Sequence, residues 1–179
     1  MKVAAIICEY NPFHYGHRYL IEKTREVGAT HIAAVMSGSF TQRGDLAVFD
    51  KYIRAKTALE NGVDLVIELP TMYSLSAAEG FAAGAVGIIE SLGCVDMLSF
   101  GSECGELSAL REASSACEYA LHTDSFHGLM KSGYSYPAAL SAVVKELYTD
   151  DVSDVLKSPN NTLAIEYLNA LDSMGSAIE

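Results

Sequence analysis

Four short hydrophobic runs occur in the first hundred residues, and segments with a helical pattern separate them. The runs begin at Val3, His31, Asp64 and Met97, so their starts are 28, 33 and 33 residues apart. Runs rich in valine, isoleucine and leucine, without alternation of polar and apolar positions, are typical of strands buried on both faces of a parallel sheet. A spacing of about 30 residues suits a strand and its crossover helix. The pattern predicts an α/β fold with an open, doubly wound parallel sheet.

The helical segments between the runs each end before a glycine, the residue favoured just after a helix. These helices are expected over His17–Val27, Asp50–Asn61 and Ala77–Leu92.

The last third of the chain has a helical pattern and no convincing strand. Ser158-Pro159 is expected to begin a helix, with serine as the N-cap and proline as the first helical residue. The sequence therefore predicts an α/β nucleotide-binding core over residues 1–104 and a helical continuation of the same domain over residues 105–179. Further helices are expected over Glu106–Leu121, Ser125–Lys131 and Pro137–Tyr148.

The composition is that of an ordinary globular domain: 179 residues, 50% hydrophobic and 20% charged. No apolar stretch approaches the roughly 20 residues that a membrane span requires, and the N-terminus does not resemble a signal peptide. The four cysteines are widely spaced and are expected to be free thiols. We expect a soluble, cytoplasmic protein that does not bind membranes.

Charge is unevenly distributed along the chain. The net charge is −11, but residues 1–56 hold eight Lys/Arg against five acids (+3), whereas residues 57–179 hold four against eighteen (−14). A phosphate-bearing ligand is expected at the N-terminal third. The alternative is a soluble surface that happens to be uneven.

The first candidate for chemistry follows the first strand. Ligands of doubly wound sheets bind at the carboxyl ends of the strands, and residues 8–17 there read C-E-Y-N-P-F-H-Y-G-H. His14 and His17 lie around Gly16 at the start of a helix, where imidazoles and exposed backbone N–H groups are expected to bind polyphosphate. The alternative is structural: one histidine caps the helix and the other packs. No carboxylate or thiol set has metal-ligand spacing, so no metal site is expected.

Five motifs in this chain resemble one family and occur in the same order along it. They are Glu9–His17, Met36–Gly44, Gly62–Pro70, Phe100–Glu103 and Ser158–Asn161. Together they resemble the bacterial tRNA(Met) cytidine acetate ligase family, part of the nucleotidyltransferase superfamily that carries the "HIGH" motif. The resemblance implies a HUP/Rossmann-like nucleotidyltransferase fold.

The resemblance also implies an activity. Such enzymes use ATP, with Mg²⁺ carried on its phosphates, to activate acetate as acetyl-adenylate. They then transfer the acetyl group to N4 of the wobble cytidine of elongator tRNA(Met). His14 and His17 are implied as catalytic. The residues implied to bind ATP are Ile7, Cys8, Glu9, Tyr10, Asn11, Pro12, Phe13, His14, Gly16, His17, Leu20, Gly101 and either Asn160 or Asn161.

Residues on the neighbouring loops are weaker candidates. Arg43 lies just beyond the second strand and is expected to bind a phosphate of ATP or tRNA, or else to be an ordinary surface arginine. Gly101 is either a close approach to the ligand or a turn glycine. Lys51 and Arg54 are expected to be solvated, and Glu68 to be structural.

The family is about twice as long as this chain, and its later part carries a second nucleotide-binding motif that does not occur here. The chain is therefore expected to be an N-terminal fragment or a natural short form. Two alternative functions remain at this stage. One is a small adenylyltransferase that makes a nucleotide-type cofactor, and the other is an ATP- or tRNA-binding fragment without turnover of its own.

Overall fold

The computed structural model describes residues 1–179 and contains two compact units. The first comprises Met1–Phe100 together with Ala170–Glu179, and the second comprises Gly101–Asn169. Residues 170–179 thus return to the unit that contains the N-terminus.

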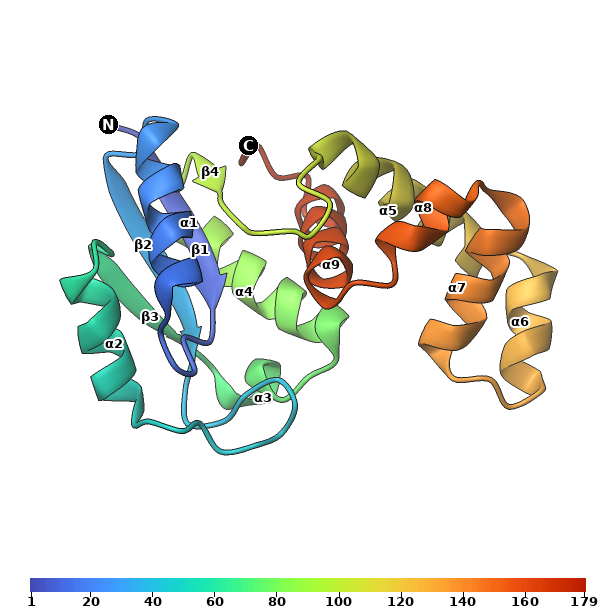
Figure 1. The fold of residues 1–179 in the computed structure, drawn as a ribbon, viewed down its shortest axis with the longest axis horizontal. Coiled ribbons are helices and arrows are strands. Elements are labelled where there is room, and N and C mark those ends of the chain that lie inside the picture. Colours follow the sequence, from blue (N-terminus) through green and yellow to red (C-terminus); the bar gives the residue numbers. More distant parts are fainter. The chain divides into compact units, whose positions relative to one another are not determined.

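The first unit is built on a parallel sheet with the strand order β3-β2-β1-β4 (Figure 1). The order reverses between β1 and β4, which makes the crevice beside β1 the place where such a sheet binds ligands. The predicted open, doubly wound α/β architecture is confirmed. The strands are β1 (Val3–Cys8), β2 (His31–Ser37), β3 (Leu65–Leu69) and β4 (Met97–Leu98).

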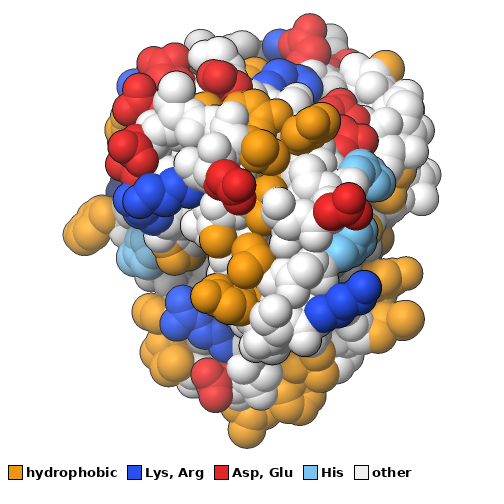
Figure 2. Space-filling view, turned by 90° about the vertical axis from the view of Figure 1, so that its right-hand side faces the viewer, with side chains coloured by type: hydrophobic (Ala, Val, Ile, Leu, Met, Phe, Trp, Pro, Cys, Tyr) orange, Lys and Arg blue, Asp and Glu red, His pale blue; other side chains and the backbone are white.

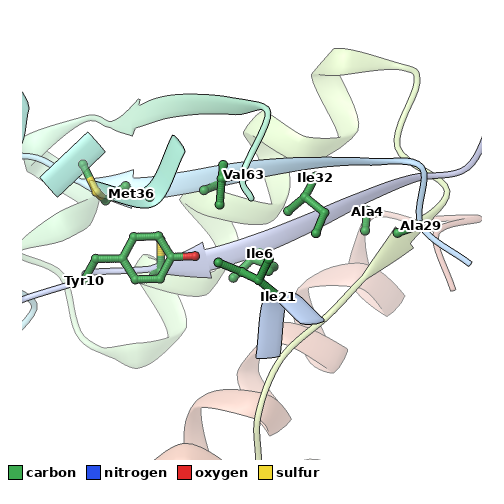
Figure 3. Close-up of a cluster of buried hydrophobic side chains, with 11 residues drawn as sticks. Ala4, Ile6, Tyr10, Ile21, Ala29, Ile32, Met36 and Val63 are labelled. Carbon is green, nitrogen blue, oxygen red and sulfur yellow. The ribbon is translucent and has the colours of Figure 1, made fainter. Parts of the chain in front are cut away.

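Helices α1 (Tyr15–Glu26) and α2 (Lys51–Glu60) pack on one face of this sheet. Alternate residues of β1 and β2 point to that face, as strand geometry requires. Figure 3 shows Ile21 of α1 beside Ile6 of β1, and Ile32 of β2 and Tyr10 belong to the same buried cluster. The remaining helices of this unit are α3 (Thr71–Ser74) and α4 (Ala78–Leu92).

The second unit is helical. Its buried positions are mostly small or aliphatic, such as Ala113 and Ala116 of α5 and Val143 and Val144 of α7. On the face seen in Figure 2, acidic and hydrophobic side chains are interspersed and the basic side chains stand apart from one another. The helices are α5 (Leu107–Leu121), α6 (Asp124–Lys131), α7 (Tyr136–Leu147), α8 (Asp150–Val155) and α9 (Pro159–Ser173), the last of which continues into the first unit.

Several predicted boundaries need correction. The fourth strand is only Met97–Leu98, although the Ser99 N–H still donates to the Ala5 carbonyl (2.8 Å). Helix α1 begins at Tyr15 rather than His17, because a histidine acts as its N-cap. The short helices α3 and α8 were not predicted. No helix is both long enough and apolar enough to cross a membrane.

Candidate functional site

The loop after β1 folds inward around Tyr10. Its backbone is in the left-handed region (φ 49°), which is costly for a bulky residue. The ring is only 1% exposed and packs edge-on against Phe13 and His17, with 4.9 Å between ring centroids in each case. Burial of this ring fixes the course of the loop and gives the His17 ring a fixed packing partner. Of the three aromatic residues of the loop, Tyr15 is the exposed one (87%).

The two histidines form a reciprocal capping box at the start of α1. His14 is the N-cap, and its Nδ1 accepts the Gly16 N–H (3.1 Å). In return, Nδ1 of His17 accepts the His14 N–H (3.2 Å). The pair therefore performs with imidazoles what Ser/Thr and Glu/Gln perform in the ordinary capping box.

This arrangement determines which ring nitrogen carries the proton. Because each Nδ1 accepts a backbone N–H, the neutral rings are protonated on Nε2. The rings are stacked, with centroids 3.7 Å apart and planes inclined by 22°. A Cβ on Gly16 would lie 3.0 Å from Cε1 of His14, so only glycine leaves this ring in place without a shift. Two parallel imidazoles thus keep their Nε2–H groups for acceptors outside the helix.

Burial, with a smaller contribution from His14, lowers the pKa of His17 to about 4. His17 is therefore neutral at pH 7 and donates from Nε2 without carrying a positive charge. A neutral donor next to a second imidazole suits the recognition of phosphoryl oxygens by hydrogen bonding.

The expected role of the backbone at this helix start needs correction. The Gly16 N–H is bound by the His14 ring, and the N–H groups of His17 and Arg18 donate to the His14 carbonyl (3.0 and 3.2 Å). The imidazole Nε2–H groups, rather than these three backbone N–H groups, are the donors available to an anion. The helical cap and a binding role are therefore compatible, since they use different nitrogens.

Two polar side chains of the first loop hold the second loop, residues 38–49. The Glu9 carboxylate accepts the Gln42 N–H (2.7 Å), and the Asn11 side-chain carbonyl accepts the Val48 N–H (2.7 Å). Glu9 and Asn11 are among the residues that the resemblance implies to bind ATP, and here their side-chain oxygens make structural contacts. The two loops at the ends of β1 and β2 are thereby joined.

Arg54 was expected to be solvated, and the structure corrects this. It is 2% exposed. Its guanidinium donates to the carbonyls of Glu9 (2.6 Å), Ser37 (3.1 Å), Gly38 and Phe49 (3.1 Å). One side chain therefore ties together the ends of β1 and β2 and the start of α2. The sequence signal was its position four residues before the buried Ala58, on the core face of α2.

The neighbouring Lys51 is also paired rather than simply solvated. Its ammonium group lies 2.7 and 2.9 Å from the two carboxylate oxygens of Glu68, at the end of β3. This contact supports the expected structural role of Glu68.

The candidates of the second unit lie together within that unit. Asn161 is 2% exposed, and its Oδ1 accepts the N–H groups of Glu103 (2.8 Å) and Cys104 (3.2 Å), while Nδ2 donates to the Val155 carbonyl (3.1 Å). Asn160 is exposed, and its amide donates to the Glu103 carboxylate (2.9 Å). Asn161 is thus fully engaged in structure, and Asn160 is the one at the surface.

The other candidates differ in exposure. Ile7 and Cys8 are buried in β1, and burial raises the pKa of the Cys8 thiol, so this group is inert at neutral pH. Leu20 is half-buried, and Arg43 is exposed near the tip of the second loop. Pro12 and Gly101 are exposed. No group of three or more His, Cys, Asp and Glu side chains is placed to hold a metal ion.

Comparison with known proteins gives the family. Residues 1–179 match the family described as HIGH Nucleotidyl Transferase. The chain belongs to the HIGH nucleotidyl transferase family. Its His14-Tyr15-Gly16-His17 differs from the letters of that name only at the exposed Tyr15.

Several relatives of this HIGH nucleotidyl transferase chain are known by name. It is 44% identical to a tRNA(Met) cytidine acetate ligase of Caldicellulosiruptor saccharolyticus over 100% of the chain and 44% of that protein. The corresponding protein of Clostridium botulinum is 41% identical, again over the whole chain and 46% of the relative. The chain therefore spans less than half the length of these relatives.

Two solved structures also match this chain over its whole length. The crystal structure of Thermotoga maritima TmcAL bound with alpha-thio ATP superimposes with a TM-score of 0.89 and 35% identity, over 100% of this chain and 45% of that one. The apo form of the same protein gives a TM-score of 0.90 and 36% identity, over 100% of this chain and 44% of that one. At these values the fold of this HIGH nucleotidyl transferase chain is the fold of the matching part of that protein.

Proposed function

We propose that this chain is the ATP-binding part of a tRNA(Met) cytidine acetate ligase. In this reaction acetate and ATP give acetyl-adenylate and pyrophosphate. The N4 amine of the wobble cytidine of elongator tRNA(Met) then takes the acetyl group, and AMP and a proton are released. The observation that carries the proposal is the histidine capping box, which leaves two Nε2–H donors at the carboxyl edge of the sheet. The named relatives and the nucleotide in the matching structure support it.

The chemistry asks the protein mainly for positioning and charge stabilisation. A carboxylate oxygen of acetate attacks the α-phosphorus as the bond to the bridging oxygen breaks, and pyrophosphate leaves with the electron pair. His14 and His17 donate hydrogen bonds to phosphoryl oxygens as negative charge moves to the leaving group. Mg²⁺ bound to the phosphates of ATP, rather than to a set of protein ligands, would supply further stabilisation of the negative charge on the leaving pyrophosphate.

Other residues have supporting roles in this proposal. Gly101 and Asn160 contact the nucleotide, whereas Asn161 only holds the loop that contains Glu103 and Cys104. Arg43 binds a phosphate of ATP or tRNA. Glu9 and Asn11 act through the second loop, because their side-chain oxygens accept its backbone N–H groups.

The direct test is calorimetric titration of this chain with MgATP. Binding is expected, with the affinity reduced in His14→Ala and His17→Ala. A hydrogen bond to a charged group is worth about 1.5–3 kcal/mol, so each loss should weaken binding or slow adenylation by roughly ten- to a hundred-fold. His14→Asn, which keeps a cap acceptor, separates loss of the cap from loss of Nε2. Absence of heat at millimolar MgATP would refute nucleotide binding.

Exchange of labelled pyrophosphate into ATP then distinguishes the activities. Dependence on acetate supports the ligase. Dependence on a phosphorylated acceptor instead points to a small adenylyltransferase. ATP binding with no exchange under either condition identifies the chain as a binding fragment whose chemistry requires other residues.

A further inference from the structure

The imidazole of His17 lies in a cluster of four rings at the start of α1. His14 stacks on it, with 3.7 Å between the ring centroids. Tyr10 and Phe13 contact it as well, with centroid distances of 4.9 and 5.5 Å and planes inclined by 65° and 50°. Tyr10 and Phe13 also pack edge-on against each other (4.9 Å), so the rings of Tyr10, Phe13 and His17 form a closed triangle. A ring in contact with three other rings has little freedom to turn.

The two rings that pack against His17 from the first loop differ in exposure. Tyr10 is 1% exposed and belongs to the buried cluster between the sheet and α1 (Figure 3). Phe13 is half-buried and packs against the edge of that cluster. Phe13 also lines an open cavity of about 240 Å³, together with Pro12 and Phe49. Because Phe13 touches His17 and also borders this cavity, its ring is placed to keep water from the imidazole.

No carboxylate offsets a positive charge on His17. The first turn of α1 has no acidic residue, and Arg18, the next residue, is paired with Glu22 (2.9 Å). Among the neighbouring titratable groups, His14 opposes protonation of His17, and Tyr10 stays neutral because burial raises its pKa. Burial among the rings is therefore the main reason that the pKa of His17 is about 4.

The charge and the orientation of His17 depend on each other. Its Nδ1 must be unprotonated to accept the His14 N–H (3.2 Å), so protonation of the ring breaks this contact. A ring released from the cap no longer presents its Nε2–H in a fixed direction. Donors that are already in place stabilise a developing charge better than donors that must first be ordered. A side chain that keeps water from the ring therefore also keeps the donor in place.

We propose that Phe13 is a positioning residue for His17: its ring keeps water from the imidazole and holds the Nε2–H group ready for a phosphoryl oxygen. The inference rests on the proposed function, in which His17 donates to a phosphate of ATP. Phe13 needs no contact with ATP and acts only through His17. The two histidines of the motif are then unequal, because His14 is exposed to solvent whereas His17 is covered.

The charge of His17 is measured by NMR, from the Cε1–H resonances of the histidines during a pH titration of the folded chain. In the unsubstituted chain His17 should titrate with a pKa of about 4. Phe13→Ala should raise this pKa toward the ordinary value of 6.5, with an increase in proton affinity of at least about ten-fold, because water reaches the ring. Phe13→Leu keeps an apolar cover and should leave the pKa near its original value. Phe49→Ala, which enlarges the same cavity but removes no ring from His17, is the matched control and should also leave it unchanged.

MgATP titration shows whether Phe13 acts through His17. At pH 8 His17 is neutral in every variant that retains it. There Phe13→Ala should weaken MgATP binding by about ten-fold, the lower end of what one hydrogen bond to a charged group is worth. In a His17→Ala background the same substitution should change the affinity by less than about two-fold, because the donor that Phe13 positions is absent. Phe13→Leu should bind MgATP as the unsubstituted chain does.

Thermal unfolding of each variant shows whether its fold is intact. If Phe13→Ala does not fold, Phe13→Gln, which keeps the length of the side chain but admits water, takes its place. Two outcomes overturn the proposal. One is a His17 pKa that neither substitution raises. The other is an equal loss of MgATP affinity with and without His17, which would make Phe13 a direct contact of the nucleotide. Failure of the unsubstituted chain to bind MgATP would instead refute the proposed function, and the NMR titration would still decide whether Phe13 controls the charge of His17.

Discussion

At the scale of single residues, His17 can close the capping box only while it is neutral. Its Nδ1 accepts the His14 N–H, and a protonated ring has no acceptor. The folded pKa of about 4 lies below the ordinary value of 6.5, because burial disfavours the charged form. Between these values the unfolded chain binds a proton at His17 and the folded chain does not. Stability from this residue is therefore present above pH 6.5 and is lost as the pH falls toward 4.

The corresponding variant is His17→Gln. Glutamine is a normal capping-box residue at this position and does not titrate. We expect the fall in urea-unfolding free energy between pH 6.5 and pH 4 to be smaller in this variant than in the unsubstituted chain. His122→Gln, at an exposed histidine after α5, is the control and should keep the original pH dependence. If unfolding free energy changed with pH equally in all three proteins, His17 would have the same pKa in the folded and the unfolded chain.

Arg54 provides a second test at this scale. Arg54→Met keeps an aliphatic stem but leaves the carbonyls of Glu9, Ser37, Gly38 and Phe49 without their donor. Because buried acceptors lose their partners, unfolding free energy should fall by at least about 3 kcal/mol. Lys56→Met, on the exposed face of the same helix, should change it by less than about 1 kcal/mol. A mild effect at Arg54, measured by urea denaturation, would contradict its role in joining the loops.

At the scale of elements, the sequence predicts the strands and helix ends that neighbouring residues determine, but not the contacts between distant segments. The four hydrophobic runs locate the starts of the strands to within a residue or so. The glycines after α1, α2 and α4 likewise locate the ends of these helices, in agreement with the structure. The shortness of β4 was not predictable, because nothing in the run Met97–Ser102 before Gly101 marks an end of the strand at Leu98. The H-x-G-H motif can be recognised in the sequence because its residues, His14 to His17, are consecutive. The role of Arg54 was missed because its partners lie 5 to 45 residues away in sequence.

The start of α9 gives a prediction about an element. Asn161→Ala leaves two N–H groups and the Val155 carbonyl without a partner, so unfolding free energy should fall by about 2–3 kcal/mol. Asn160→Ala should cost less than about 1 kcal/mol, because this side chain is exposed. Under the proposed function Asn160→Ala weakens MgATP binding instead. Denaturation measures the structural role and calorimetry with MgATP measures the binding role in both variants. Weaker MgATP binding without loss of stability in Asn161→Ala, and loss of stability in Asn160→Ala, would contradict both assignments.

At the scale of the whole molecule, the chain returns to its first unit at the end of α9. The Leu98 N–H donates to the Glu179 carbonyl (2.9 Å), and the Glu179 N–H donates to the Asp96 carbonyl (3.0 Å). The Ser176 hydroxyl donates to the Glu90 carboxylate of α4. Sequence patterns gave no indication of this return, because residues 176–179 have neither periodicity nor a strand-like run. Long-range pairing of a short irregular segment is visible only in three dimensions.

Removal of residues 176–179 should therefore destabilise the first unit and spare the helical one. The backbone hydrogen bonds that join Glu179 to Asp96 and Leu98 are lost, as are the bond from the Ser176 N–H to the Leu171 carbonyl, the Ser176–Glu90 contact and the exposed ion pair between Lys2 and Glu179. The expected cost is about 1–3 kcal/mol. Amide hydrogen exchange should accelerate at Leu98 and along β1, while the amides of Val143 and Val144 in α7 keep their protection. Ser176→Ala is the milder companion, because it removes the contact with Glu90 and the acceptor of the Ile178 N–H (3.0 Å) but keeps the backbone pairing of Glu179. Uniform acceleration in both units would mean that they unfold as one cooperative body, and unchanged exchange at Leu98 would mean that the terminal pairing contributes nothing to the edge of the sheet.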